Sequence, residues 1–131
     1  MRIILTLICL VLIQTINAQT QSEMNEEAYN QYTMVDKKLN EVYQNIRKEY
    51  KNDTLFLNNL KKAQRIWITY RDAELEMKYP KTDKIFNYGS VYPVCKFLFL
   101  KNMTEERIKT LEVWLNGIEE GEVCLGSVKM K

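Results

Sequence analysis

The sequence predicts an all-α protein: a small bundle built on a long antiparallel helix pair plus two shorter helices, with an irregular C-terminal tail tethered by a disulfide. Three observations lead to this expectation. The 131 residues include only two prolines and four glycines, and these cluster where helices are expected to end. Apolar residues recur three or four positions apart over long stretches, as on one face of a helix. Two cysteines follow these stretches and can brace the tail.

The first long helix is predicted from Met24 to Tyr50, with Ser22 as a candidate N-cap. Its apolar stripe is Met24, Ala28, Tyr32, Val35, Leu39, Val42, Ile46 and Tyr50. The run Asn52-Asp53-Thr54 interrupts this pattern and supplies a cap for the following helix.

The second long helix is expected to end near Tyr79, because Pro80 disfavours a helical conformation in the residue before it. Its stripe contains Leu57, Leu60, Gln64, Trp67, Tyr70 and Arg71. Trp67 and Tyr70 are therefore predicted to pack in the core. Because the link between the two helices is short, they are expected to be antiparallel neighbours.

The remaining chain predicts two shorter helices and a tail. Pro93 suits the first turn of a third helix, and Thr104 can cap a fourth. The fourth helix has an apolar face made of Ile108, Leu111, Trp114 and Leu115. Gly117 is expected just after its end, and the tail from Ile118 to Lys131 shows no periodicity.

Residues 1–18 have the pattern of a secretory signal that is removed, leaving a single domain of residues 19–131. Arg2 precedes a largely apolar run from Ile3 to Ile16, and Ala18 offers a small residue for cleavage before Gln19. The apolar run is too short to span a membrane, so we expect no membrane span after cleavage and a periplasmic or secreted location. The alternative is an uncleaved anchor.

The charge balance argues against a nucleic-acid partner. The formal net charge of the chain is +2, and Lys and Arg alternate with Asp and Glu along the predicted helices. Such a pattern is typical of solvated helix faces, and it offers no basic patch for phosphate.

Cys95 and Cys124 are predicted to form a disulfide. Cys9 leaves with the signal, and two thiols in an oxidising compartment usually pair. The closed loop would stabilise the fold by about 3.5 kcal/mol. A redox or nucleophilic pair is the alternative, but the spacing is not that of a C-x-x-C motif and the chain has no histidine to activate a thiolate.

The residue types give no catalytic site, metal site or cofactor site. The chain contains no histidine, which removes the common zinc, haem and serine-hydrolase arrangements. Asp36 and Asp72 are the acids embedded in the most patterned stretches, and a glycosidase would need two carboxylates in a cleft. We interpret them instead as members of interhelical ion pairs, either Asp36 with Arg71 or Asp36 with Arg65.

Three residues in the connection before the third helix are candidate binding residues. Tyr88, Ser90 and Tyr92 lie in this segment, and exposed aromatic residues on a loop held by helices make a good binding device. The alternative is that they cover the open end of the helix pair.

Several stretches resemble the small exported bacterial proteins grouped as LprI-like lysozyme inhibitors. They are Glu23–Asn25, Asp36–Tyr43, Leu60–Glu74, Gly89–Cys95 and Met103–Arg107. The residues that carry the resemblance, expected to be structural, are Asp36, Leu39, Asn40, Tyr43, Gln64, Trp67, Tyr70, Arg71 and Asp72. Cysteines that members often carry are replaced here by Glu27 and Leu75, and Cys124 is additional.

The resemblance implies stoichiometric inhibition of a peptidoglycan-degrading lysozyme and no enzymatic activity. Lysozymes are typically cationic, so an inhibitor is expected to present acidic residues. The dense acidic cluster of this chain is Glu119, Glu120 and Glu122. Either the tail that carries this cluster or the Tyr88–Tyr92 loop is expected to meet the enzyme. The alternative function is that of an envelope structural or interaction protein without an enzyme target. The oligomeric state is open.

Overall fold

The computed structural model describes the backbone of residues 2–121 and 123–131, and the side chains from residue 20 onward within these ranges. The described residues form four helices: α1 (Arg2–Glu49), α2 (Thr54–Lys78), α3 (Lys84–Tyr88) and α4 (Tyr92–Asn116). The prediction of an all-α fold is confirmed. The predicted export signal, residues 1–18, lies outside the described side chains and stays a prediction. Within the described residues, no helix is both long and apolar enough to cross a membrane.

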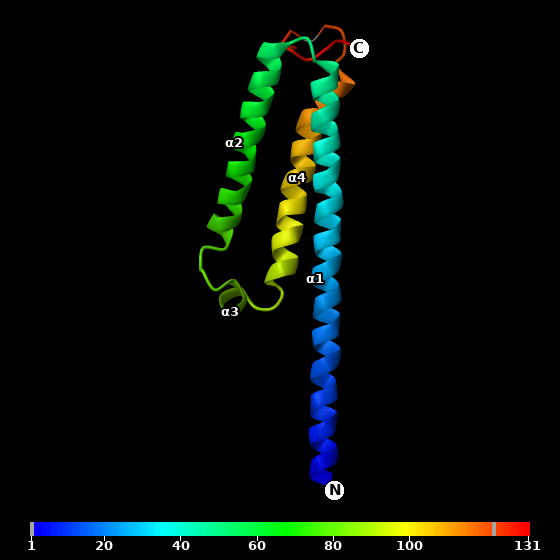
Figure 1. Ribbon diagram of the computed structural model, residues 1–131, viewed down its shortest axis with the longest axis vertical. Helices are drawn as coiled ribbons and strands as arrows, with labels where there is room; N and C mark the ends of the chain where they lie inside the picture. The colour runs from blue at the N-terminus through cyan, green and yellow to red at the C-terminus, as the bar shows by residue number, and fades with distance from the viewer. Residues whose placement is uncertain (1, 122) are drawn as a thin grey trace.

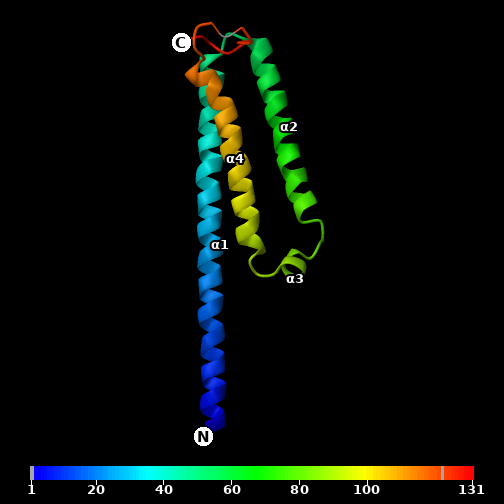
Figure 2. The same ribbon diagram turned by 180° about the vertical axis from the view of Figure 1, so that it is seen from behind.

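The principal helix pair is α1 with α4, not α1 with α2 as predicted. Figure 1 and Figure 2 show α4 running beside α1 in the same direction, with α2 antiparallel to both and set apart from α1. The short link does reverse the chain, but the apolar stripe of α1 packs against α4. The core consists of Leu39, Val42, Ile46, Leu60, Ile108 and Leu111. Only Leu60 of this core comes from α2.

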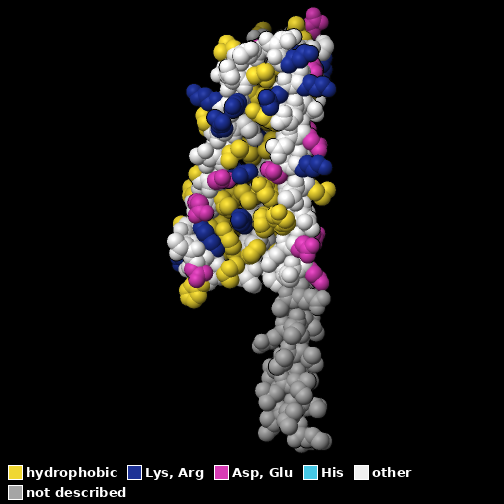
Figure 3. Space-filling view, in the orientation of Figure 1, with side chains coloured by type: hydrophobic (Ala, Val, Ile, Leu, Met, Phe, Trp, Pro, Cys, Tyr) yellow, Lys and Arg dark blue, Asp and Glu magenta, His cyan; other side chains and the backbone are white. Residues whose placement is uncertain are grey.

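A cavity of about 400 Å³ lies between the first half of α2 and the last half of α4. It is lined by Leu55, Phe56, Asn59, Leu60, Ala63, Arg107, Leu111, Trp114, Ser127 and Asp53. Figure 3 shows hydrophobic side chains along the middle of this face, with charged ones beside them.

The helix boundaries confirm some of the predicted signals and correct others. Asp53 caps α2, since its carboxylate accepts a hydrogen bond from the Phe56 amide at 2.9 Å. Ser22 is not a cap, because α1 is continuous there. Thr104 is not a cap either. It is completely buried inside α4, and its hydroxyl donates to the Leu100 carbonyl at 2.7 Å. The two predicted shorter helices are thus one helix, and α3 was not predicted.

The C-terminal tail folds back over the upper end of α4 without a disulfide. The Ile118 amide donates to the Lys129 carbonyl, and the Trp114 indole donates to the Ser127 hydroxyl. Cys95 and Cys124 are both free thiols. Cys95 lies in the first turn of α4 and Cys124 in the tail beyond its last turn, about 30 Å along the helix axis. A disulfide needs Cα atoms within about 7 Å, so the predicted tether is wrong for this structure.

Gly117 ends α4 with a φ of 72°, and a Cβ added there would lie 2.8 Å from the Lys129 carbonyl oxygen. Gly117→Ala is therefore expected to lower the free energy of unfolding by roughly 2–4 kcal/mol. Gly89→Ala is the matched control. Gly89 has a φ of 81° and open space around it, so its loss should be only about 1–2 kcal/mol. Urea unfolding of both variants measures the difference, and equal losses would contradict the close packing of the tail.

Candidate partner-binding surfaces

The side chain of Trp67 lies between two arginines and ties α2 to α4. The guanidinium carbons of Arg71 and Arg107 are 5.3 and 5.8 Å from its ring. Arg107 reaches across from α4 and donates to the Gln64 amide oxygen at 3.0 Å. Partial burial without an acidic partner lowers the pKa of Arg107. Gln64 and Trp67 of α2 are thus both in contact with Arg107 of α4, and their structural role stays a prediction.

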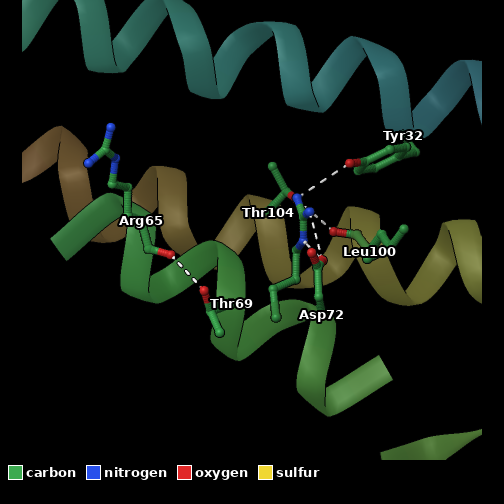
Figure 4. Close-up of polar contacts among 7 residues, drawn as sticks. Tyr32, Arg65, Thr69, Asp72, Leu100 and Thr104 are labelled. Carbon is green, nitrogen blue, oxygen red and sulfur yellow. Dashed lines mark hydrogen bonds and ion pairs between the residues drawn. The ribbon is translucent and has the colours of Figure 1, made fainter. Parts of the chain in front are cut away.

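Arg71 pairs with its sequence neighbour Asp72, at 2.8 Å, and not with Asp36 as predicted. It also donates to the Tyr32 hydroxyl, at 3.4 Å. Figure 4 shows Tyr32 on α1 and Asp72 on α2 on either side of these contacts. The pKa of the Tyr32 phenol is raised, and burial is the largest cause. This contact joins α1 to α2 through polar atoms where few apolar side chains meet.

The other motif residues on α1 have separate roles. Leu39 is part of the core, and Tyr43 packs against that core from its edge. The Asn40 side chain donates to the Asp36 carbonyl at 3.1 Å, a contact within the helix. Neither ion pair predicted for Asp36 is present among the described residues.

Tyr70 is exposed, which contradicts its predicted place in the core. The inward side of α2 carries Leu60, Gln64, Trp67, Arg71 and Leu75. Tyr70 precedes Arg71 by one residue, which turns it by about 100° around the helix axis and out of that side. Its exposed side chain lines a hollow between α2 and α4, together with Trp67 and Arg107.

The connection between α2 and α4, residues 79–92, is a well-braced turn. The rings of Tyr88 and Tyr92 each lie 5.1 Å from the ring of Tyr79, edge to face. The Tyr88 hydroxyl accepts a hydrogen bond from the Lys81 amide at 3.1 Å. Asp83 caps α3, since its carboxylate accepts from the Phe86 amide at 3.0 Å. These contacts fix the shape of the turn.

The tyrosines of this turn brace it and are half-buried, whereas other residues face the solvent. Ser90 is exposed, as the binding interpretation requires. The apolar side chains that face the solvent are Ile85, Phe86 and Val91, with Phe86 84% exposed. The sequence analysis selected Tyr88, Ser90 and Tyr92 in this segment and not Phe86. The signal that could have found it is an aromatic residue three positions after Asp83, in the first turn that this aspartate can cap.

Burial raises the pKa of the Tyr79 phenol above its usual 10.0, and the neighbouring Cys95 adds to the effect. Because the pKa is higher in the folded than in the unfolded state, the neutral Tyr79 phenol contributes to the free energy of unfolding. This contribution is complete below pH 10 and is lost as the pH rises through the folded-state pKa. We expect unfolding by urea to become easier above about pH 10 in the wild type. Tyr79→Phe should flatten this dependence, and Tyr70→Phe, at an exposed tyrosine, should not. Parallel slopes for all three proteins would contradict the assignment.

The acidic tail lies at the opposite end of the α2–α4 pair from the turn (Figure 1). Glu119 and Glu120 are exposed, and Glu122 lies outside the described residues. The Glu119 carboxylate is 3.4 Å from the Lys131 ammonium, so part of the acidic charge is neutralised locally. Val123 beside them is 96% exposed. The two candidate surfaces are therefore too far apart to form one interface.

A comparison with protein families identifies the chain. The family model described as lysozyme inhibitor LprI matches residues 14–111, three quarters of the sequence. The chain belongs to the LprI family. The match covers the motif residues and the braced turn, and it ends before the tail. No curated protein and no solved structure matches this LprI-family chain.

Proposed function

We propose that this chain is an exported protein that binds a peptidoglycan-degrading lysozyme and inhibits it by stoichiometric contact, without enzymatic activity of its own. The observation that carries the proposal is the LprI family match over residues 14–111. The mature protein would be a single domain of residues 19–131, acting in the periplasm or outside the cell. The partner is a protein, and the chain needs no cofactor for this role.

The braced turn, residues 79–92, is the proposed contact surface. A surface that serves the family activity should lie within the part of the chain that the family shares, and the turn does so. Glu119, Glu120 and Glu122 lie beyond that part, so they are the weaker candidate. Tyr88 and Tyr92 would act by holding the turn in shape, while Ser90 and Phe86 would meet the enzyme.

The chemistry of the turn suits an enzyme cleft. Phe86 is a large exposed apolar side chain on a short capped helix, so little backbone conformational entropy is lost when it is buried. Aromatic anchors of this kind often dominate interface energies. A lysozyme cleft carries two carboxyl groups, and the exposed Lys81 on the same turn offers an opposite charge.

The test is a titration of the purified mature protein against several lysozymes in a cell-wall lysis assay. Inhibition that saturates near equal molarity is the expected result. A folded sample that leaves every lysozyme active at large excess would overturn the proposal. In that case the envelope-protein alternative predicts that the chain co-purifies with an envelope component.

A further inference from the structure

The cavity between α2 and α4 is lined mainly by apolar side chains. Its volume of about 400 Å³ lies in the range of pockets that hold small molecules, roughly 300–1,000 Å³. The apolar residues that line it are Leu55, Phe56, Leu60, Ala63, Leu111 and Trp114. A lining of this kind favours a ligand with an apolar body and few polar groups.

Arg107 is the cation of this cavity, and it has no carboxylate partner within the part of the chain that the structure describes. Its Nε–H donates to the Gln64 amide oxygen at 3.0 Å, and its guanidinium lies over the Trp67 ring. Its Nη groups donate to no described atom of the chain. The neighbouring Glu106 is paired with Lys109 at 2.6 Å. A guanidinium stays charged and can bind a carboxylate through two parallel hydrogen bonds, so Arg107 offers an anion a half-buried site.

The charged groups that line the cavity lie at opposite ends of it. Arg107 lies at the level of Gln64, to which it donates. Asp53 lies at the start of α2, about 16 Å from Gln64 along the helix axis. Its carboxylate already accepts a hydrogen bond from the Phe56 amide. An anionic group beside Arg107 would thus lie far from the acid that lines this cavity.

Arg107 also lines a second hollow between the same two helices, of about 380 Å³. The other residues of this hollow are Trp67, Tyr70, Asn102, Met103, Glu106 and Thr110. Its lining is more polar, and the Glu106 carboxylate repels an anion. The first cavity is therefore the better place for the apolar part of a ligand whose anionic group contacts Arg107.

We propose that the cavity between α2 and α4 binds a single-chain amphiphile with a carboxylate head group, such as a fatty acid. The carboxylate accepts hydrogen bonds from the Nη groups of Arg107, and the chain lies against Leu60, Phe56 and Trp114. A peptide fits less well, because its backbone N–H and C=O groups need partners. The backbones of α2 and α4 are paired within their helices, and the Ser127 hydroxyl already accepts from the Trp114 indole.

The test is isothermal titration calorimetry of the mature protein with three amphiphiles of equal chain length, each below its micelle-forming concentration. Decanoate carries a negative charge, decylammonium a positive charge, and decanol none, and decanoate should bind most tightly. Arg107→Gln should weaken decanoate binding at least about tenfold and leave decanol binding unchanged, because it removes the charge and keeps the apolar lining. The matched control is Arg65→Gln, at an exposed arginine of α2 that does not line this cavity, and it should retain decanoate binding.

A second pair of variants blocks the cavity and keeps Arg107. Ala63 is exposed at the wall of the cavity, so Ala63→Trp should leave the protein folded and abolish decanoate binding. Ala73→Trp is its control, at an exposed alanine further along α2 that does not line the cavity. Circular dichroism establishes that each variant is folded. Should Arg107→Gln not fold, this pair carries the test.

Four results would overturn the proposal: no binding of decanoate, equally tight binding of decylammonium, or decanoate binding that is unchanged by Arg107→Gln or by Ala63→Trp. An apolar peptide with a free C-terminal carboxylate that displaces decanoate and binds more tightly would also overturn it, and would assign the cavity to a peptide. The cavity is separate from the braced turn, so these outcomes are independent of the lysozyme assay.

Discussion

Phe86→Ala is expected to raise the concentration needed for half-maximal lysozyme inhibition by about 30-fold or more, the usual cost of removing an aromatic anchor. The side chain is 84% exposed in the free protein, so its removal should leave the free energy of unfolding within about 0.5 kcal/mol of the wild-type value. The lysis assay measures the first quantity and urea unfolding the second. A large loss of inhibition with unchanged stability places the side chain at the interface.

The control for this variant is Val123→Ala. Val123 is an exposed apolar residue of the acidic tail, and it lies outside the family match. The Val123→Ala variant should retain full inhibition. If Val123→Ala weakens inhibition and Phe86→Ala does not, the tail and not the turn contacts the enzyme. Charge reversal of Glu119 and Glu120 would then be the next variant.

Ile46→Ala is expected to lower the free energy of unfolding by about 3–4 kcal/mol. Ile46 is 0% exposed and lies in the centre of the cluster that joins α1, α2 and α4. Truncation removes buried apolar atoms and leaves a cavity that a well-packed helix interface fills only in part. Because a domain of this size is marginally stable, this loss is a large fraction of the total.

Met34→Ala is the matched control on the same helix. Its side chain is 73% exposed, so the change in unfolding free energy should stay within about 0.5 kcal/mol. Both variants are measured by urea unfolding followed by circular dichroism. Similar losses for the two would mean that the α1–α4 core is not where the stability resides.

Local sequence signals predicted the helices well, because helix periodicity and end signals are local properties. Leu39, Val42 and Ile46 of the predicted α1 stripe are buried as expected, whereas Met24 of the same stripe is exposed. Asp53 caps α2 as predicted. Thr104 shows where such signals fail. The same hydroxyl that can cap a helix can also donate to a carbonyl one turn back, and burial in α4 selects the second state.

The sequence pattern did not predict which distant segments of the chain pack together. A short link between α1 and α2 predicts that they are neighbours, but nothing local indicates that α4 offers α1 the better apolar face. The cysteine pairing failed for a related reason. Compartment chemistry suggests that two thiols pair, whereas the length of α4 keeps Cys95 and Cys124 apart.

The candidate site was predicted by segment but not by residue. Tyr88 and Tyr92 lie in the turn that the sequence selected, and they brace it, whereas Phe86 faces the solvent. An aromatic residue in a loop is equally compatible with both roles until the rings around it are placed. Tyr70 illustrates the same limit on a helix, since one residue of offset from Arg71 leaves its side chain exposed at the edge of the inward side of α2.

The most direct test of the proposed contact is amide hydrogen exchange of the mature protein, alone and with an equimolar lysozyme that it inhibits. Slower exchange on binding is expected in the braced turn, residues 79–92, with the tail unchanged. Slower exchange confined to residues 117–131, or none anywhere in the chain, would contradict the assignment of the turn as the inhibitory surface.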